Sequence, residues 1–226
     1  MATIAENLQA VEARIGRAAR AAGRDRAAVT LLAVSKTHRP ERVREAAAAG
    51  QRAFGENYVQ EALEKIAALP GLEWHLIGPL QSNKTRPAAQ HFAWVHTLQS
   101  ERIARRLSEQ RPAALAALNV LLQVNASGEA TKSGVAIGET ASLARAVSAL
   151  PRLRLRGLMA IPEPGAPASR YREVASLYRA LQGEFAFDTL SMGMSDDLEL
   201  AIAEGATLVR VGTAIFGARR KEATVA

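Results

Sequence analysis

Short apolar segments and amphipathic helical segments alternate along almost the whole chain, and this alternation constrains the fold more than any other feature. Eight segments have the length and apolar character of buried strands. They cover residues 29–34, 53–55, 73–77, 93–97, 120–124, 155–161, 189–192 and 208–211. A chain that alternates in this way is expected to form a parallel sheet, because each helix carries the chain back before the next strand begins.

Helical patterns with an apolar face lie between these strands, and one more precedes them. The intervening patterns cover about residues 40–49, 56–68, 83–91, 100–110, 138–149, 168–182 and 196–204. The first helix is predicted over about residues 3–22, where Ile4, Leu8, Val11 and Ile15 recur at helical spacing before Gly23. Eight strand–helix units of about 28 residues each favour a compact barrel over an open sheet. We therefore predict an α/β fold, a single (β/α)₈ barrel of the TIM type with an extra N-terminal helix.

The domain organisation is predicted to be equally simple. A chain of 226 residues can build one well-buried core. Its one Pro/Gly cluster, at 162–167, follows the sixth strand and is typical of a loop. We expect one domain over residues 1–226, with the N-terminal helix within about 1–24 and a tail over about 221–226.

Composition argues against several classes of partner. The net charge is +7, but the arginines are scattered along helical segments, and aromatic residues that stack on bases form only 4% of the chain. No apolar run approaches the roughly 20 residues that span a bilayer, and the N-terminus lacks the features of a signal peptide. The chain has no cysteine. We expect a cytoplasmic protein that binds neither nucleic acid nor membrane.

Lys36 closes the first predicted strand, at the position where barrel enzymes display their functional groups. A lysine amine can condense with an aldehyde, and a guanidinium cannot replace it in this reaction. The chain takes most of its positive charge from arginine and keeps only five lysines, at positions 36, 65, 84, 132 and 221. This scarcity favours a chemical role for Lys36, which we predict to be a covalent anchor.

The loops after the seventh and eighth strands indicate a phosphate site. In barrels, these loops commonly hold a phosphate through free backbone N–H groups. Ser191 and Ser195 offer hydroxyl donors, although Ser195 could also be an ordinary helix cap. Asp196 and Asp197 would repel a phosphate, so we expect them to point away from it. Arg210 in the eighth strand is predicted to face the mouth of the barrel. An amine, an arginine and a phosphate site together fit pyridoxal phosphate.

Seven ordered segments resemble the pyridoxal phosphate homeostasis protein family. They are Ala33–Lys36, Phe54–Tyr58, His75–Lys84, Gln123–Asn125 with Thr131–Gly134, Arg156–Pro162, Ser191–Asp197 and Val209–Gly217. The resemblance implies a fold like the barrel half of alanine racemase without its second β domain. It also implies a carrier or regulator of pyridoxal phosphate with no established catalytic turnover, which could supply apo-enzymes.

The resemblance also implies a role for individual residues. Lys36 would be the Schiff-base lysine, Asn57 a polar contact, Met159 a packing neighbour of the ring, Arg210 the partner of the pyridine nitrogen, and Ser191, Ser195, Gly212 and Thr213 the phosphate site. His75, Asn83, Lys84 and Lys132 stay open, since a lone histidine on an apolar strand is more often a core residue and loop lysines are often simply solvated.

A small amino-acid racemase is the alternative function. Arginine at the ring nitrogen makes the pyridine a poorer electron sink, which disfavours transamination and decarboxylation but not racemisation. Alanine racemase, however, needs a tyrosine from a partner subunit. The tyrosines of this chain, Tyr58, Tyr171 and Tyr178, all lie in helical patterns. The missing second domain removes the usual dimer surface, so we expect a monomer.

Overall fold

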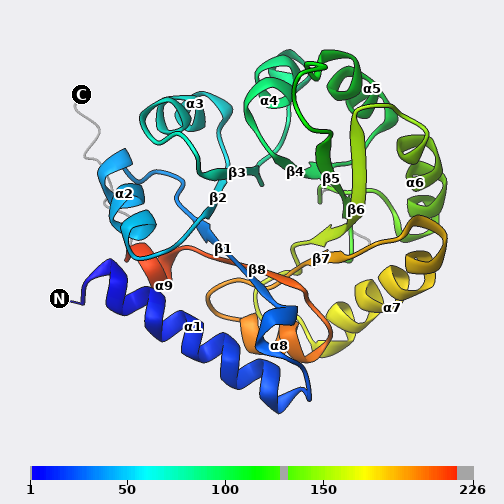
Figure 1. Cartoon of the computed structure of the whole chain (residues 1–226). Coiled ribbons are helices and arrows are strands. Elements are labelled where there is room, and N and C mark those ends of the chain that lie inside the picture. The colour runs from blue at the N-terminus through cyan, green and yellow to red at the C-terminus, as the bar shows by residue number, and fades with distance from the viewer. Residues whose placement is uncertain (1, 128–131, 218–226) are drawn as a thin grey trace, which may run out of the picture.

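Eight parallel strands close into a barrel in the order of the chain, and helices surround it (Figure 1). The strands are β1 (Thr30–Val34), β2 (Ala53–Glu56), β3 (Glu73–Leu76), β4 (Trp94–Leu98), β5 (Leu118–Val124), β6 (Leu153–Ala160), β7 (Thr189–Ser191) and β8 (Leu208–Val211). β1 pairs with both β2 and β8, which closes the ring. This computed structural model describes residues 2–127 and 132–217, and it confirms the predicted barrel.

The helices alternate with the strands as predicted. They are α1 (Ile4–Ala21), α2 (Pro40–Ala48), α3 (Val59–Ala68), α4 (Thr85–His91), α5 (Glu101–Gln110), α6 (Thr140–Ser148), α7 (Ala168–Phe185), α8 (Leu198–Ala203) and α9 (Thr213–Phe216). Short 3₁₀ turns cover Arg26–Ala28, Ser82–Lys84 and Ile137–Glu139. The sequence did not predict α9, because a single helical turn is too short to show periodicity. The predicted tail at 221–226 lies outside the described residues.

Helix α1 crosses the outside of the barrel and covers α8 and α9 (Figure 1). It begins with a capping box, in which Thr3 and Glu6 each accept a hydrogen bond from the other's backbone N–H. Its buried face packs on the barrel, and Asn7 donates a hydrogen bond to the carbonyl of Ile215 in α9. Arg14 forms an ion pair with Glu199 in α8. The extra helix therefore supports the two helices that follow β7 and β8.

Side chains of β1 alternate between the helices and the barrel interior, as the period of two in a strand requires. Leu31 and Ala33 belong to the apolar core between strands and helices. Leu32 lies in the interior, where its side chain approaches Gly55 of β2. Val34 lines a cavity at the end of the barrel, and Lys36 lines the same cavity two residues later. The strand register thus directs Lys36 inward.

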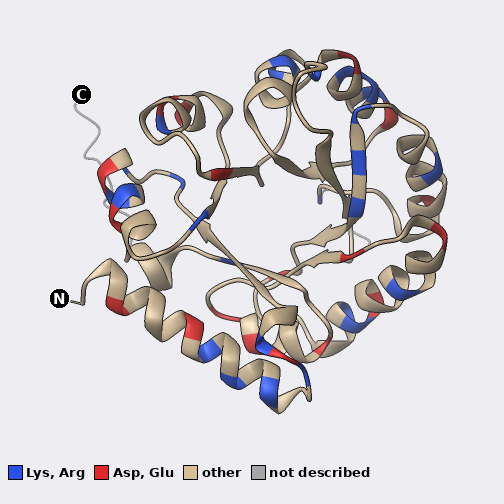
Figure 2. Cartoon of the chain, in the orientation of Figure 1, with Lys and Arg blue, Asp and Glu red and all other residues tan. Residues whose placement is uncertain are grey.

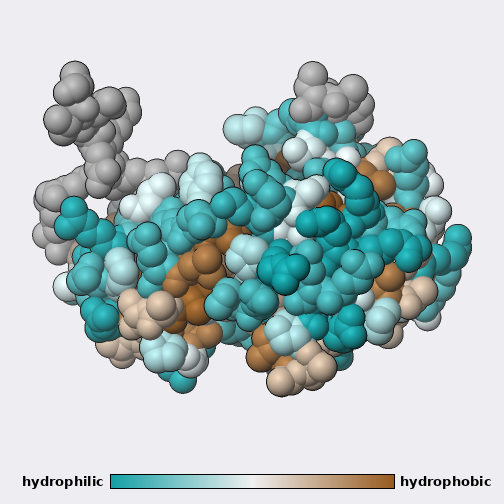
Figure 3. Space-filling model, turned by 90° about the horizontal axis from the view of Figure 1, so that it is seen from above, coloured by the Kyte–Doolittle hydropathy of each residue, from teal (hydrophilic) through white to brown (hydrophobic). Residues whose placement is uncertain are grey.

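Charged residues gather on the outer helices, where both signs are interspersed (Figure 2). The face turned by 90° from that view likewise shows mostly hydrophilic side chains, with smaller hydrophobic areas between them (Figure 3). No helix in the described part of the chain is long and apolar enough to cross a membrane.

Candidate functional site

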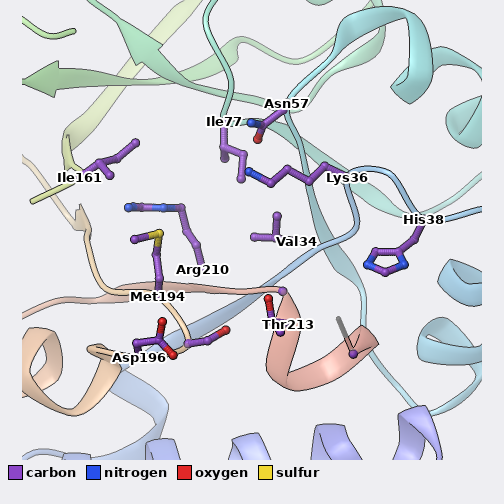
Figure 4. Close-up of a pocket in the computed structure, with 13 residues that line it drawn as sticks. Val34, Lys36, His38, Asn57, Ile77, Ile161, Met194, Asp196, Arg210 and Thr213 are labelled. Carbon is purple, nitrogen blue, oxygen red and sulfur yellow. The ribbon is translucent and has the colours of Figure 1, made fainter. Parts of the chain in front are cut away.

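A cavity of about 220 Å³ opens at the carboxyl ends of the strands (Figure 4). Loops and strand ends from β1, β2, β3, β6, β7 and β8 contribute to it. Its lining residues are Val34, Lys36, His38, Asn57, Ile77, Ile161, Met194, Ser195, Asp196, Arg210, Gly212, Thr213 and Gly217. This end of a barrel is where enzymes of this fold place their binding sites.

The structure brings six of the eight predicted site residues to this cavity. They are Lys36, Asn57, Ser195, Arg210, Gly212 and Thr213. Met159 and Ser191 lie deeper, and both are fully buried in the barrel interior. Met159 packs with Trp94 and Leu121, while Ile161, two residues later, reaches the cavity. Met159 and Ser191 belong to β6 and β7 themselves, and these two strands contribute to the cavity lining through the residues that follow them.

Lys36 and Arg210 enter the cavity from neighbouring strands (Figure 4). Their nitrogen atoms point into the same space, between Ile77 on one side and Ile161 on the other. An amine and a guanidinium are thus held together against apolar walls. Such an arrangement suits a flat, partly apolar ligand that carries an electrophilic carbon and an acceptor atom.

The turn that carries Lys36 is held by polar groups on both sides, buried before it and partly exposed after it. Before it, the Ser35 hydroxyl donates to Glu56 Oε1 at 2.5 Å. After it, the backbone N–H of Thr37 donates to Glu61 Oε1 at 2.5 Å. Thr37 has a φ of 66°, a left-handed conformation that is uncommon for a β-branched residue. The surrounding contacts therefore maintain a strained turn at the base of the predicted anchor.

Lys65 connects these contacts through hydrogen bonds to three of the same groups. Its Nζ donates hydrogen bonds of 2.7 Å to Glu56 Oε1, to Glu61 Oε1 and to the Ser35 carbonyl. Burial raises the pKa of Glu56, and the neighbouring Lys65 partly opposes this shift. Glu56 Oε2 has no hydrogen-bond partner among the described residues. The sequence pattern does not reveal this cluster, although Lys65 is one of only five lysines.

Arg210 is a buried cation with neutral direct partners. Its NH1 group donates to Ser191 Oγ at 2.7 Å, and its NH2 group donates to the Ala160 carbonyl at 2.9 Å. Among the described residues no carboxylate lies within ion-pair distance of it. Burial lowers the pKa of Arg210 to about 10, while the charge of Asp197 acts in the opposite direction. The side chain therefore remains a hydrogen-bond donor at neutral pH.

Asp196 and Asp197, which were expected to point away from the site, have different surroundings, and only Asp196 is among the described lining residues. The Asp197 carboxylate accepts a hydrogen bond from the Tyr171 hydroxyl and another from the backbone N–H of Met194. α8 begins at Leu198 rather than at residue 196, so both aspartates lie in the loop before it. The Met194 N–H and the Tyr171 hydroxyl hold the Asp197 carboxylate there.

The four residues that the sequence left open lie elsewhere. His75 is buried and bonds to Glu73 and His96, so it is a satisfied interior residue. Lys84 donates to Gln60 outside the cavity. Asn83 belongs to the 3₁₀ turn before α4, and Lys132 lines a separate cavity near Asn125.

Comparison with known proteins identifies the family. The model of the family described as alanine racemase, N-terminal domain, matches residues 7–220. A protein of Pseudomonas aeruginosa named pyridoxal phosphate homeostasis protein is 63% identical, with 97% of each chain covered. The chain belongs to the pyridoxal phosphate homeostasis protein family. The resemblance seen in its seven segments is thereby confirmed.

Other members of the family extend this comparison. The pyridoxal phosphate homeostasis protein of Escherichia coli K12 is 54% identical, with 97% of this chain and 98% of that protein covered. The structure of PipY from Synechococcus elongatus, solved with PLP bound, is 37% identical and has a TM-score of 0.81. It matches 95% of this chain and the full length of PipY. The whole described barrel is thus shared with a family member that binds the cofactor.

Proposed function

We propose that this protein binds pyridoxal phosphate in the cavity at the carboxyl ends of the strands. We further propose that it stores the cofactor and hands it over, instead of turning over a substrate. The observation that carries this proposal is the convergence of Lys36 and Arg210 on one cavity (Figure 4). The names of the relatives and the PLP-bound structure of PipY support it.

The chemistry of the lining fits the three functional groups of this cofactor. The Lys36 amine suits the aldehyde, and the Arg210 guanidinium suits the acceptor nitrogen of the ring. Ser195, Gly212 and Thr213 lie together on the loops after β7 and β8, where barrels commonly hold phosphate. Asn57 offers a polar side chain from the loop after β2. Ile77 and Ile161 provide apolar walls.

The proposed attachment is reversible, as storage requires. The Lys36 amine condenses with the aldehyde, a carbon–nitrogen double bond forms and one water molecule leaves. Hydrolysis of this Schiff base restores both the free lysine and the free aldehyde. The contacts around Ser35 and Thr37 hold the lysine in place before the cofactor arrives, which lowers the entropy lost on binding.

The surroundings of Arg210 favour storage over catalysis. A guanidinium donates a hydrogen bond but does not give up its proton, so the pyridine ring stays neutral and withdraws electrons weakly. A racemase also needs an acid or base opposite the lysine. The hydroxyl of Tyr171 is instead bonded to Asp197, and burial raises its pKa. Tyr58 and Tyr178 do not belong to the described lining either.

Titration with pyridoxal phosphate, followed by absorbance, tests the proposal. We expect a Schiff-base band in the wild type and in the matched control Lys84→Ala, and no band in Lys36→Ala. The loaded protein should restore activity to an apo-enzyme that depends on this cofactor. It should not exchange the α-hydrogen of amino acids with deuterated solvent. Exchange that requires Lys36 would instead favour the racemase function.

A further inference from the structure

A line of hydrogen-bonded side chains crosses the interior of the barrel. Glu73 contacts His75 at 2.8 Å, and His75 contacts His96 at 2.9 Å. His96 contacts the Ser191 hydroxyl at 3.2 Å. The oxygen of this hydroxyl accepts a hydrogen bond of 2.7 Å from Arg210. These five residues come from β3, β4, β7 and β8. They connect the amino end of β3 with the cavity at the opposite end of the barrel.

The two ends of this line differ in their access to solvent. The Glu73 side chain is 51% exposed at the amino end of β3. The other four residues are buried, and the cavity lies above the last of them, Arg210. A polar line of this length in an otherwise apolar interior would be unfavourable unless each group had a partner. Among the fully buried side-chain nitrogen and oxygen atoms of these four residues, none lacks a partner.

The terminal groups fix the direction of every bond in the line. A carboxylate can only accept and a guanidinium can only donate, so all the protons point from Arg210 towards Glu73. Ser191 then donates to Nδ1 of His96. His96 donates from Nε2 to Nδ1 of His75, which donates from Nε2 to Glu73. Burial lowers the pKa of each histidine, so both rings are neutral, and the direction of the line places the proton of each ring on Nε2.

We propose that His96 and Ser191 are positioning residues for Arg210, and that the line couples its guanidinium to the Glu73 carboxylate on the opposite face. Arg210 has no direct carboxylate partner among the described residues, so aligned dipoles that end in a negative charge stabilise it. They also hold one edge of the guanidinium. The remaining donors of the guanidinium are then fixed in the cavity. Their use at the ring nitrogen of the cofactor rests on the proposed function. Ser191 accordingly serves Arg210 and not the phosphate.

The neighbours of the line are consistent with a fixed arrangement. The His75 ring stacks on Trp94 with 5.1 Å between ring centroids. Arg156 lies 4.7 Å above the Trp94 ring and pairs with Asp188. These groups and Glu73 line the same cavity at the amino end of the line. They hold the His75 ring in one plane, so its nitrogen atoms stay aimed at Glu73 and His96.

Nitrogen NMR of the histidine-labelled full chain without cofactor tests the direction of the line. The chain has only four histidines, so single substitutions are enough to assign the signals. At pH 7.5 we expect His75 and His96 to be neutral with the proton on Nε2. In Glu73→Gln the terminal amide can also donate, so the Nδ1-protonated form should appear in both rings together. A proton on Nδ1 in the wild type, or a change confined to His75, would overturn the proposal.

Cofactor affinity tests the effect on Arg210. Ser191→Ala should raise the dissociation constant for pyridoxal phosphate about tenfold, because one buried hydrogen bond to the guanidinium is lost. Ser108→Ala removes another buried serine hydroxyl, far from the line, and should leave the constant unchanged. Equal effects in both variants would refute the positioning role. A wild type that fails to bind the cofactor would refute the proposed function instead, while the NMR result on the line would still stand.

Discussion

Lys65 and Glu56 form an ion pair of 2.7 Å whose side chains are 2% and 0% exposed. The pair lies directly behind the turn that carries Lys36, and the same lysine also bonds to the Ser35 carbonyl. A charge pair in this position fixes the backbone without occupying the cavity. It gives the predicted anchor a rigid support, which a binding site requires of the residues around it.

Loss of the buried cation should strongly destabilise the fold. Lys65→Met leaves the Glu56 carboxylate buried beside Glu61 without a counter-charge, which is expected to lower the free energy of unfolding by about 3–5 kcal/mol. Urea denaturation measures this change. The double variant Lys65→Met with Glu56→Gln should recover much of the loss, because it removes the uncompensated charge. If the double variant is as unstable as the single one, packing and not charge is responsible.

The buried histidines should make stability depend on pH below neutrality. Burial lowers the pKa of His75 and His96 in the folded state, so the unfolded chain takes up protons at a higher pH. The free energy of unfolding should therefore fall as the pH drops below about 6.5, by up to about 1.4 kcal/mol per pH unit for each histidine.

Denaturation between pH 8 and 5.5 measures this slope. His96→Gln should flatten it, whereas His91→Gln, which changes an exposed histidine of α4, should not. The same slope in His96→Gln and in the wild type would contradict the assignment.

Gly78 should not tolerate a side chain. An added Cβ atom would lie 2.1 Å from the carbonyl oxygen of Asn57, and no flexible group is there to move away. Gly78→Ala is expected to lower the free energy of unfolding by about 2–3 kcal/mol and to displace Asn57 from the cavity. Gly183→Ala is the matched control, since nothing lies within 4 Å of its Cβ position and alanine favours a helix. Equal stability of the two variants would contradict the close approach.

Thr213 should distinguish phosphorylated from unphosphorylated ligand. Thr213→Val removes a hydroxyl at the predicted phosphate site and keeps the shape of the side chain. We expect affinity for pyridoxal phosphate to fall about tenfold and affinity for pyridoxal to stay constant. Thr30→Val, at the opposite end of the barrel, should change neither affinity. Parallel losses for both ligands in Thr213→Val would place the phosphate elsewhere.

The fold could be predicted from the sequence because local pattern and global structure agree in a parallel barrel. Each strand is buried on both faces, and each helix shows one apolar face. The differences lie at the ends of elements. β5 starts at Leu118 and β6 at Leu153, two residues before the predicted starts in each case, because these two strands pair with each other over their full length. Such pairing is a tertiary effect that no short window of sequence contains.

Site residues could be predicted from the sequence only where they lie at or just after the end of a strand. Lys36 and Arg210 stand at such positions, and the strand period directs both inward. The bond between His96 and Ser191 joins residues 95 positions apart, and the contact of Lys65 with Glu56 depends on how α3 lies against β2. The partner of Asp197, Tyr171, is supplied by another helix. Contacts of this kind arise from packing, and the sequence pattern does not encode them locally.

Borohydride reduction of the cofactor-loaded protein, followed by peptide mapping, tests the central proposal most directly. Reduction converts a Schiff base into a stable secondary amine, so the attached lysine keeps a pyridoxyl label. Lys36→Ala and Lys84→Ala are treated in parallel. The proposal predicts a label on Lys36 in the wild type and in Lys84→Ala, and no specific label in Lys36→Ala. A label on Lys65, Lys84 or Lys132 in the wild type would contradict it.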